Sequence, residues 1–393
     1  MSRGTTLLLG LLTFLLMMPE TLPVPVLRGL VVERFGVSDG LATLFLVANM
    51  IGALIALPIV GLHVDRTGKR RRLCVALLLC DALFMQLLAR PLDYPTFLLL
   101  RTFEGAAHLS ALTLLMSLVA DAAGRHRGRA LGMVGAGLTL GVATGAAVGG
   151  VLGKDDPLRT LHTASLVLLA AALVGTFVLP PDAESEKRPG YRELLQAVRS
   201  EPRLKAPLLL AFFDRFTVGF FTTGFPLMMA GLHGIPTPTI GKMLGAFLFP
   251  FAILSYPFGR AAERWSRVHL VAIGSLVYGA LVATVGIVQP QTQWLIMPLC
   301  GIASAVMFIP TLLWLLERAP GVGRSTAMAA FHSAGSLGFL LGPLACKQLL
   351  EAGGGGADGY ALAFGVAGLA EVFGAVLILA LALARAKRKR STR

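Results

Sequence analysis

The chain has 393 residues, of which 55% are hydrophobic and 14% charged, and its formal net charge is +14. This composition leaves too little polar surface to cover two or three soluble domains of that total length, which excludes an ordinary soluble protein. A basic folded face with interleaved aromatic residues is missing as well, so we expect no nucleic-acid partner.

Apolar runs of about 20 residues follow one another along the chain, and each is long enough to cross a bilayer as a helix. Lipid offers no partners to backbone groups, so a span must be a helix or part of a closed barrel, and the alternating pattern of a barrel is absent. The sequence therefore predicts an all-α membrane protein with twelve transmembrane helices. The predicted spans are 6–28, 41–63, 73–91, 96–119, 130–152, 161–180, 205–231, 239–260, 268–289, 293–316, 326–350 and 359–384.

The first span follows Arg3 and could be read as a secretory signal peptide. Its apolar run continues past Pro19 and Glu20 to about Leu27, and no small-residue cleavage site follows. We therefore interpret this segment as the first transmembrane helix.

Lys and Arg are distributed unevenly between the two sides of the predicted membrane. With a cytoplasmic N-terminus, 26 of the 35 Lys and Arg residues fall in cytoplasmic segments, and seven fall on the opposite side. Cytoplasmic loops are enriched in these residues, so we predict that both termini are cytoplasmic. The basic tail, residues 386–393, would then lie against anionic lipid headgroups.

The longest cytoplasmic connection divides the spans into two groups of six. It is rich in charge and proline, and it predicts an N-terminal bundle at 1–180, a linker at 181–204 and a C-terminal bundle at 205–385. Residues also recur at offsets of 196 to 198, as in Gly141 with Gly338 and Asp121 with Glu317. Duplicated halves with a site between them are a recurring plan of transporters.

Three motifs carry a resemblance to a known family. The stretch GLHVDRTGKR at 61–70 resembles the loop that joins helices two and three in the major facilitator superfamily. RTFEGAAH at 101–108 resembles the arginine motif of helix four, and GVATGAAVGG at 141–150 resembles the helix-five antiporter motif, with Ala146 in place of its proline. The resemblance implies two pseudo-symmetric six-helix bundles and the twelve-helix drug:proton antiporter branch.

For the loop, the resemblance implies a gate on the cytoplasmic side. Asp65 can face the positive N-terminal end of a neighbouring helix, and Arg66 can pair with Asp121 at the end of helix four. Alternatively, the basic residues only fix the topology, which we favour for Arg71 and Arg72. The predicted gating residues are Gly61, Asp65, Arg66, Gly68, Lys69, Arg70 and Asp121.

Ionisable side chains inside spanning helices are unfavourable to insert and are therefore functional candidates. The resemblance implies that helices one, four, seven and ten line a central cavity. The candidates on these helices, which we predict to couple protons to substrate, are Glu20, Arg101, Glu104, His108, Asp214 and Arg215. Asp81 and Glu371 fall on peripheral helices, and we interpret them as structural or lipid-edge residues.

Arg101, Glu104 and His108 are three and four residues apart and so share one helix face. Arg101 and Glu104 could equally be an internal ion pair that only makes insertion tolerable, and His108 a hydrogen-bonded bystander. Asp214 and Arg215 need not pair, because consecutive residues of a helix point about 100° apart. A buried carboxylate such as Asp214 can bind a proton near neutral pH.

Glycines at steps of four residues mark a close-packing face in span five, and Gly335, Gly338 and Gly342 mark a similar one in span eleven. The predicted helix-packing residues are Gly141, Gly145, Gly149, Gly338, Gly342 and Pro343.

Other chemistries have little support in the sequence. It contains no Walker loop, no His/Cys/Asp spacing typical of a metal site and no Gly-x-Ser-x-Gly elbow, so we predict no ATP use, no metal, no cofactor and no enzyme.

We expect a monomeric transporter of the inner membrane that works by alternating access. Its partners would be membrane lipids, protons and a small amphipathic molecule, which it exports in exchange for protons. One alternative keeps the fold and moves a lipid-like or sugar substrate by uniport. Another is a membrane receptor or scaffold that does not transport.

Overall fold

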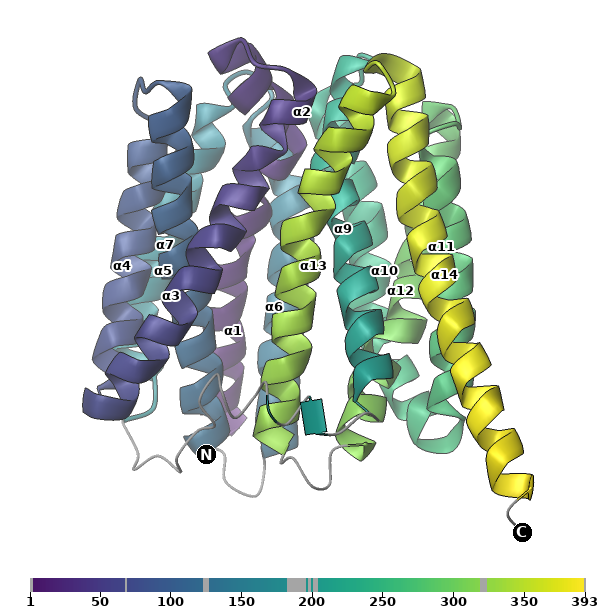
Figure 1. Ribbon diagram of the computed structural model, residues 1–393. Helices are drawn as coiled ribbons and strands as arrows, with labels where there is room; N and C mark the ends of the chain where they lie inside the picture. Colours follow the sequence, from purple (N-terminus) through teal and green to yellow (C-terminus); the bar gives the residue numbers. More distant parts are fainter. Residues whose placement is uncertain are drawn as a thin grey trace. The chain divides into compact units, whose positions relative to one another are not determined.

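The computed structural model describes residues 3–67, 69–122, 127–181, 196, 199–200, 204–318 and 324–391. Within these ranges the chain forms helices and no β-strand, as Figure 1 shows. The predicted all-α class is therefore confirmed for the described residues.

The chain divides into two compact units, each described here by itself. Unit 1 comprises Met1–Lys187 and Pro226–Leu248, and unit 2 comprises Arg188–Phe225 and Phe249–Arg393. The start of the eighth predicted span thus belongs with the N-terminal half of the chain. The predicted bundle boundaries stay a prediction.

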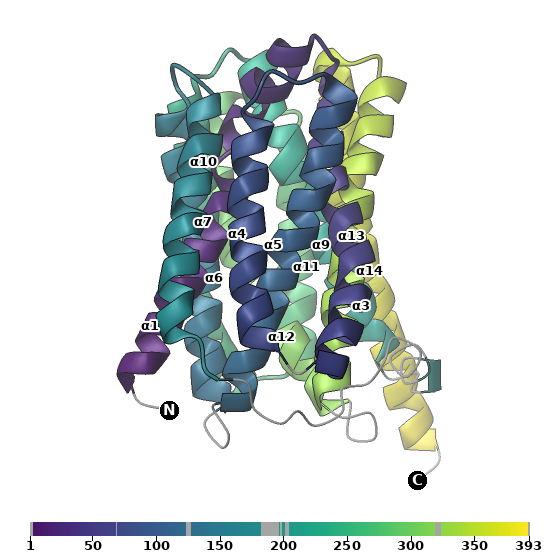
Figure 2. The same cartoon turned by 90° about the vertical axis from the view of Figure 1, so that its left-hand side faces the viewer.

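Unit 1 contains the helices of the first half of the chain. They are α1 (Arg3–Thr21), η1 (Val24–Val26), η2 (Arg28–Glu33), α2 (Asp39–Ala42), α3 (Leu44–Thr67), α4 (Arg70–Leu88), α5 (Tyr94–Ala122), α6 (Arg127–Leu152) and α7 (Leu158–Val178). Helix α4 packs against both α5 and α7, and Figure 2 shows α4 beside α5.

The second half of the chain forms six further long helices. They are α9 (Lys205–Gly231), α10 (Thr237–Arg264), α11 (Arg267–Val285), α12 (Pro290–Glu317), α13 (Arg324–Ala352) and α14 (Gly356–Ser391). The ends of α9 and α10 that meet at Pro226–Leu248 belong to unit 1, and the rest belongs to unit 2. Within unit 2, α11 packs against α12 and α14.

In the described part of the chain, nine helices are long and apolar enough to cross a membrane. The predicted spans 73–91, 96–119 and 326–350 coincide with α4, α5 and α13, which are not among the nine. Helix α4 carries the charged residues Arg70, Arg71, Arg72 and Asp81, and several side chains of α5 and α13 lie outside the described part of the chain.

Helix α1 is interrupted shortly after Glu20. It ends at Thr21, and Pro23 and Pro25 follow; proline lacks a backbone donor and cannot continue a regular helix. The chain then forms the 3₁₀ turn η1 and the π-helical turn η2, a rare conformation that often occurs near functional sites. Glu20 therefore lies in the last turn of α1, next to irregular backbone.

Helices α1 and α6 meet backbone to backbone along a seam of glycines. The seam residues of α6 are Gly137, Gly141, Gly145 and Gly149, and each faces one of Gly10, Phe14 and Met18 of α1 or Leu22, directly after its end. A Cβ atom on any of the four glycines would lie 2.1 to 2.6 Å from the backbone oxygen of the residue it faces. Only glycine permits this approach. We call these eight residues the α1–α6 seam.

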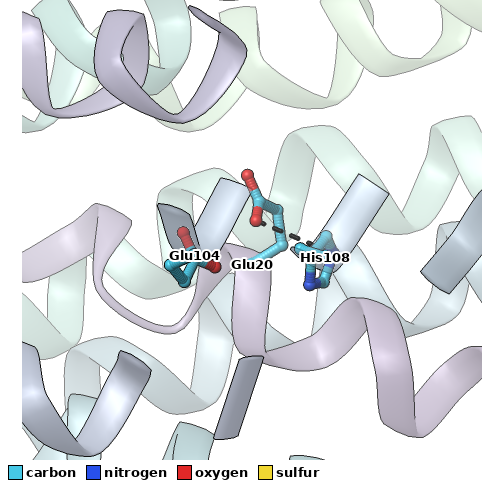
Figure 3. A group of neighbouring side chains, drawn as sticks. All are labelled: Glu20, Glu104 and His108. Atoms are coloured by element: carbon cyan, nitrogen blue, oxygen red, sulfur yellow. Dashed lines mark ion pairs between the residues drawn. The ribbon is translucent and has the colours of Figure 1, made fainter. Parts of the chain in front are cut away.

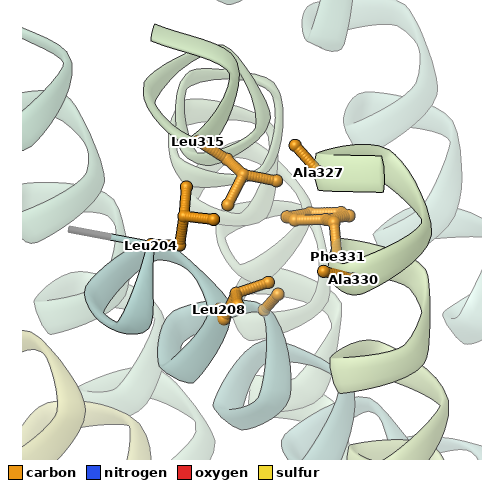
Figure 4. Packing of buried hydrophobic residues seen from close by; sticks show 7 residues of the cluster. Leu204, Leu208, Leu315, Ala327, Ala330 and Phe331 are labelled. Carbon is orange, nitrogen blue, oxygen red and sulfur yellow. The ribbon is translucent and has the colours of Figure 1, made fainter. Parts of the chain in front are cut away.

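Unit 2 has a similar approach of α13 to α9. A Cβ atom on Gly338 or Gly342 would lie 2.3 Å from a backbone oxygen of α9, and Pro343 lies against Gly219. Near one end of this contact, apolar residues from the start of α9 and from α12 and α13 form a buried cluster, drawn in Figure 4. Its members are Leu204, Leu208, Ala211, Leu315, Ala327, Ala330 and Phe331.

Candidate functional site

Five ionisable side chains from three helices meet inside unit 1. Glu20 comes from α1, Asp81 from α4, and Arg101, Glu104 and His108 from α5. Four of them are fully buried, and the side chain of Glu20 is 15% exposed. We call these five residues the α5 cluster. Figure 3 shows the side chains of Glu20, Glu104 and His108 next to one another.

Arg101 joins two carboxylates of the α5 cluster. Its guanidinium donates a hydrogen bond to Glu104 Oε2, and its Nη2 lies 3.6 Å from Glu20 Oε1. The guanidinium also lies over the ring of Phe45, 4.2 Å from the ring centre, where the aromatic face attracts a cation. Arg101 therefore links α5 to α1 and rests on α3.

Helix α3 approaches α5 closely enough to contribute a polar side chain. Asn49 Nδ2 donates to Glu104 Oε2 over 3.0 Å. The approach depends on Gly52 and Gly105, where a Cβ atom would lie 1.7 and 2.2 Å from backbone oxygens of the facing helix. The glycine of the RTFEG stretch thus positions the glutamate that precedes it.

His108 faces a carboxylate on each side of its ring. Nδ1 lies 2.8 Å from Asp81 Oδ2, and Nε2 lies 3.7 Å from Glu20 Oε2, the pair that is dashed in Figure 3. A continuous chain of contacts therefore runs from Asp81 through His108, Glu20 and Arg101 to Glu104.

The α5 cluster has fewer partners than its polar atoms require. Glu20 Oε2, Asp81 Oδ1, Glu104 Oε1 and His108 Nε2 lack a hydrogen-bond partner among the described residues. Three carboxylates face one arginine and one histidine, so at least one negative charge remains unbalanced even when His108 is protonated. Buried polar groups are normally paired, and such a cluster is therefore suited to bind and release protons.

Glu20, Glu104 and His108 also satisfy the spacing of metal ligands, because one ligand atom of each lies within 4.8 Å of the others. The guanidinium of Arg101 lies among the same carboxylates. Its fixed positive charge opposes a divalent ion at this place.

The sequence did not predict that Asp81 joins the α5 cluster. Asp81 is fully buried, so it does not lie at a lipid-facing edge. The signal was present in α4, whose buried residues Cys74, Leu78 and Met85 are separated from Asp81 by helical spacings of seven, three and four residues. Glu371 is fully buried in the same way.

Asp214 and Arg215 lie in unit 2, at the middle of α9. Arg215 Nε lies 3.9 Å from Asp214 Oδ2, and the guanidinium covers the ring of Phe308 at 4.6 Å. The neighbours on α9 thus do interact, although weakly.

The structure describes only part of the predicted gate. Arg70 is buried at the start of α4, and Lys69 is exposed directly before it. The side chains of the other predicted gating residues lie outside the described part of the chain; they are Gly61, Asp65, Arg66, Gly68 and Asp121. The predicted packing glycines of α6 lie on the α1–α6 seam.

The sequence matches the model of the Major Facilitator Superfamily over residues 9–213 and again over residues 207–393. The chain belongs to the major facilitator superfamily. It is accordingly a multi-pass membrane transporter rather than an enzyme. No curated protein sequence matches it.

Solved structures of superfamily members share this fold at low sequence identity. A bacterial homologue of the human lysosomal transporter Spinster, in an inward-facing state, superposes with a TM-score of 0.77 at 15% identity over 96% of each chain. The nucleoside transporter NupG gives 0.77 at 14% over 96% of this chain and 99% of that one. A D-xylose–proton symporter gives 0.74 at 15% over 96% and 97%.

Proposed function

We propose that this superfamily member is a secondary active transporter that couples its substrate to protons through the α5 cluster. The observation that carries the proposal is the excess of buried carboxylates over bases in that cluster, together with their unpartnered oxygens. It would work by alternating access, as a monomer in the inner membrane with both termini in the cytoplasm.

Arg101 supplies the means of coupling. While Glu20 and Glu104 are both ionised, each holds the guanidinium. Protonation of either carboxylate removes its attraction for the guanidinium and frees Arg101 to turn towards the other. A ligand shifts a conformational equilibrium only if its affinity differs between the two conformations. The proton meets this condition if Arg101 pairs with a different carboxylate in each conformation.

The cargo that we propose is a small amphipathic molecule, exported in exchange for protons. Support comes from Glu20, whose side chain is 15% exposed beside cluster members that are fully buried. The loop residues 61–70 would close the cytoplasmic side in one state.

A second candidate keeps the same coupling and changes the cargo to a sugar, a nucleoside or a lipid. Its support is the fold shared with a D-xylose–proton symporter, a nucleoside transporter and a Spinster homologue. Fold likeness at this identity does not discriminate between the two cargo classes.

The test uses inverted membrane vesicles whose lumen is acidified and measures uptake of a fluorescent lipophilic cation. The variants are Glu20→Gln and Glu104→Gln, which keep the side-chain shape and remove the charge. The control is Asp93→Asn, at an exposed position before α5. Export coupled to protons predicts uptake that needs the gradient, persists in the control and fails in at least one cluster variant.

Lack of gradient-driven uptake by the wild type would reject the amphipathic cargo. Radiolabelled pentose and nucleoside uptake would then be measured with an inward proton gradient in right-side-out vesicles. Gradient-independent transport that Glu20→Gln and Glu104→Gln leave intact would contradict proton coupling for either cargo.

A further inference from the structure

Unit 2 contains two buried acids that have no part in the proposed mechanism. Asp214 of α9 is 6% exposed and Glu371 of α14 is fully buried. Asp214 Oδ1 and both carboxylate oxygens of Glu371 lack a hydrogen-bond partner among the described residues. Helices α14 and α9 pack together beside these acids, where a Cβ atom on Gly374 would lie 2.7 Å from the ring of Phe213. Two such carboxylates in one low-dielectric interior require a positive charge.

The surrounding groups supply one positive charge for two carboxylates. Arg215 lies 3.9 Å from Asp214, and it is the one cation of the described residues paired with either acid. The other titratable groups that face the pair carry no positive charge in either protonation state: Tyr278 of α11, and Cys300 of α12 beside it. His332 of α13 lies beside Arg215. One negative charge is therefore left.

A small cavity adjoins Asp214. Its volume is about 10 Å³, close to the space that one water molecule needs. Two hydroxyl groups line it: Ser275 donates to Met307 Sδ over 3.3 Å, and Thr311 donates to the backbone oxygen of Met307 over 2.7 Å. Because the Thr311 hydroxyl uses its hydrogen elsewhere, only its lone pairs remain for a molecule in the cavity.

The remaining walls of the cavity decide which cation fits. They are mostly apolar and include Leu210, Phe308 and Phe331. A dehydrated metal ion needs about six oxygen ligands, and one carboxylate with two hydroxyls offers too few. A proton needs a single carboxylate oxygen.

We propose that Asp214 and Glu371 form a second proton-binding site, in unit 2, which holds one proton between two carboxylates. The proton arrives on water in the cavity; an O–H bond forms at a carboxylate oxygen, and a neutral water molecule remains. Ser275, which lies beside Glu371 and lines the cavity next to Asp214, bridges the two halves of the site. This site extends the proposed proton coupling from one cluster to two.

The test is infrared spectroscopy of the purified full-length protein in lipid nanodiscs, titrated with acid and base. A protonated carboxylic acid has a carbonyl stretching band that a carboxylate lacks, and the band shifts in heavy water. The wild type is expected to show this band at neutral pH. The double variant Asp214→Asn with Glu371→Gln is expected to lose one carboxylic-acid equivalent, and the exposed control Asp93→Asn is expected to lose none.

An unchanged band in the double variant would overturn the proposal. Loss of the wild-type band when Na⁺ replaces choline at constant pH would also overturn it, because the site would then bind a metal ion in competition with the proton. If the double variant does not fold by circular dichroism, Glu371→Asp keeps an acid in place and is expected to shift the band without abolishing it. An unshifted band in Glu371→Asp would contradict the assignment.

This spectroscopic result is independent of the transport assay. Acid-driven transport that fails in Glu20→Gln or Glu104→Gln supports the proposed function whether or not the second site exists. Conversely, the band can be lost in the double variant even if the cargo has been assigned wrongly.

Discussion

His108 stands between two acids, with Asp81 at Nδ1 and Glu20 at Nε2. The two contacts differ, since Asp81 Oδ2 is at hydrogen-bond distance and Glu20 Oε2 is not. The close partner fixes the orientation of the ring, while the distant one leaves Nε2 able to accept or donate a proton. An imidazole held in this way is suited to pass a proton between α1 and α4.

Asp81→Asn tests the orienting role of Asp81. The amide preserves the shape of the side chain and removes its charge, and a hydrogen bond to a charged group contributes about 1.5–3 kcal/mol. We expect the free energy of unfolding to fall by about 2 kcal/mol and the thermal midpoint in detergent to fall by several degrees.

The control for this measurement is Asp93→Asn. Asp93 is exposed, and its hydrogen bond with Thr96 lowers the pKa of Asp93. Surface substitutions usually change stability by less than about 0.5 kcal/mol, so its thermal midpoint should match the wild type. Equal midpoints for both variants would mean that His108 does not depend on Asp81.

At the scale of a single helix, α6 presents glycines to two different surroundings. Gly145 belongs to the α1–α6 seam, and its Cβ atom would lie 2.2 Å from the backbone oxygen of Met18. Gly135, two turns and more away on the same helix, would have no atom within 4 Å of its Cβ. The same substitution should therefore have opposite effects at the two positions.

We expect Gly145→Ala to destabilise the protein by about 1–3 kcal/mol, because the added methyl group forces α1 and α6 apart. Gly135→Ala should stabilise it by up to about 1 kcal/mol, through the higher helix propensity of alanine. Thermal unfolding of both variants measures the two signs. In unit 2, Gly338→Ala and Gly365→Ala form an equivalent pair, since Gly365 also has nothing within 4 Å. Shifts of the same sign for Gly145→Ala and Gly135→Ala would contradict the seam.

At the scale of the whole chain, part of the second half is bound into unit 1. The first half of α10 lies against the end of α6, where a Cβ atom on Gly150 would lie 2.3 Å from the backbone oxygen of Thr237 and 3.0 Å from the Cα of Gly241. Alternating access requires that contacts between the two halves of the sequence break and re-form in each cycle.

A steric variant tests whether transport needs this contact to close. Gly150→Ala places a Cβ atom 2.3 Å from the backbone oxygen of Thr237, so the first half of α10 can no longer approach α6. We expect Gly150→Ala to lower the transport rate, while the control Gly135→Ala, whose Cβ atom has nothing within 4 Å, leaves it unchanged. Full transport by Gly150→Ala would show that the cycle does not need this contact.

The orientation in the membrane is a further property of the whole chain. Because 26 of the 35 Lys and Arg residues lie on one side of the predicted membrane, we expect both termini to face the cytoplasm. Reporter fusions at the C-terminus that are active only in the cytoplasm or only outside it measure this directly. Activity of the outside reporter would reverse the predicted topology.

The parts of the site that depend on one helix could be predicted from the sequence, and the parts that depend on crossing helices could not. The spacing of Arg101, Glu104 and His108 places them on one face of any α-helix. Asp81 and Asn49 join them only because α4 and α3 cross α5 at particular heights, which the local sequence does not determine. The same holds for Glu371, whose nearness to Asp214 depends on the packing of α14 and α9.

The α1–α6 seam has a mechanical consequence. Glu20 lies between Met18 and Leu22, whose backbone oxygens touch Gly145 and Gly149, and Gly150 in turn touches α10. No flexible side chain separates the backbones at these points, so nothing between them can absorb a displacement. Under the proposed mechanism, a shift of α1 when Glu20 gains or loses a proton would therefore move the end of α6 directly, and α10 with it.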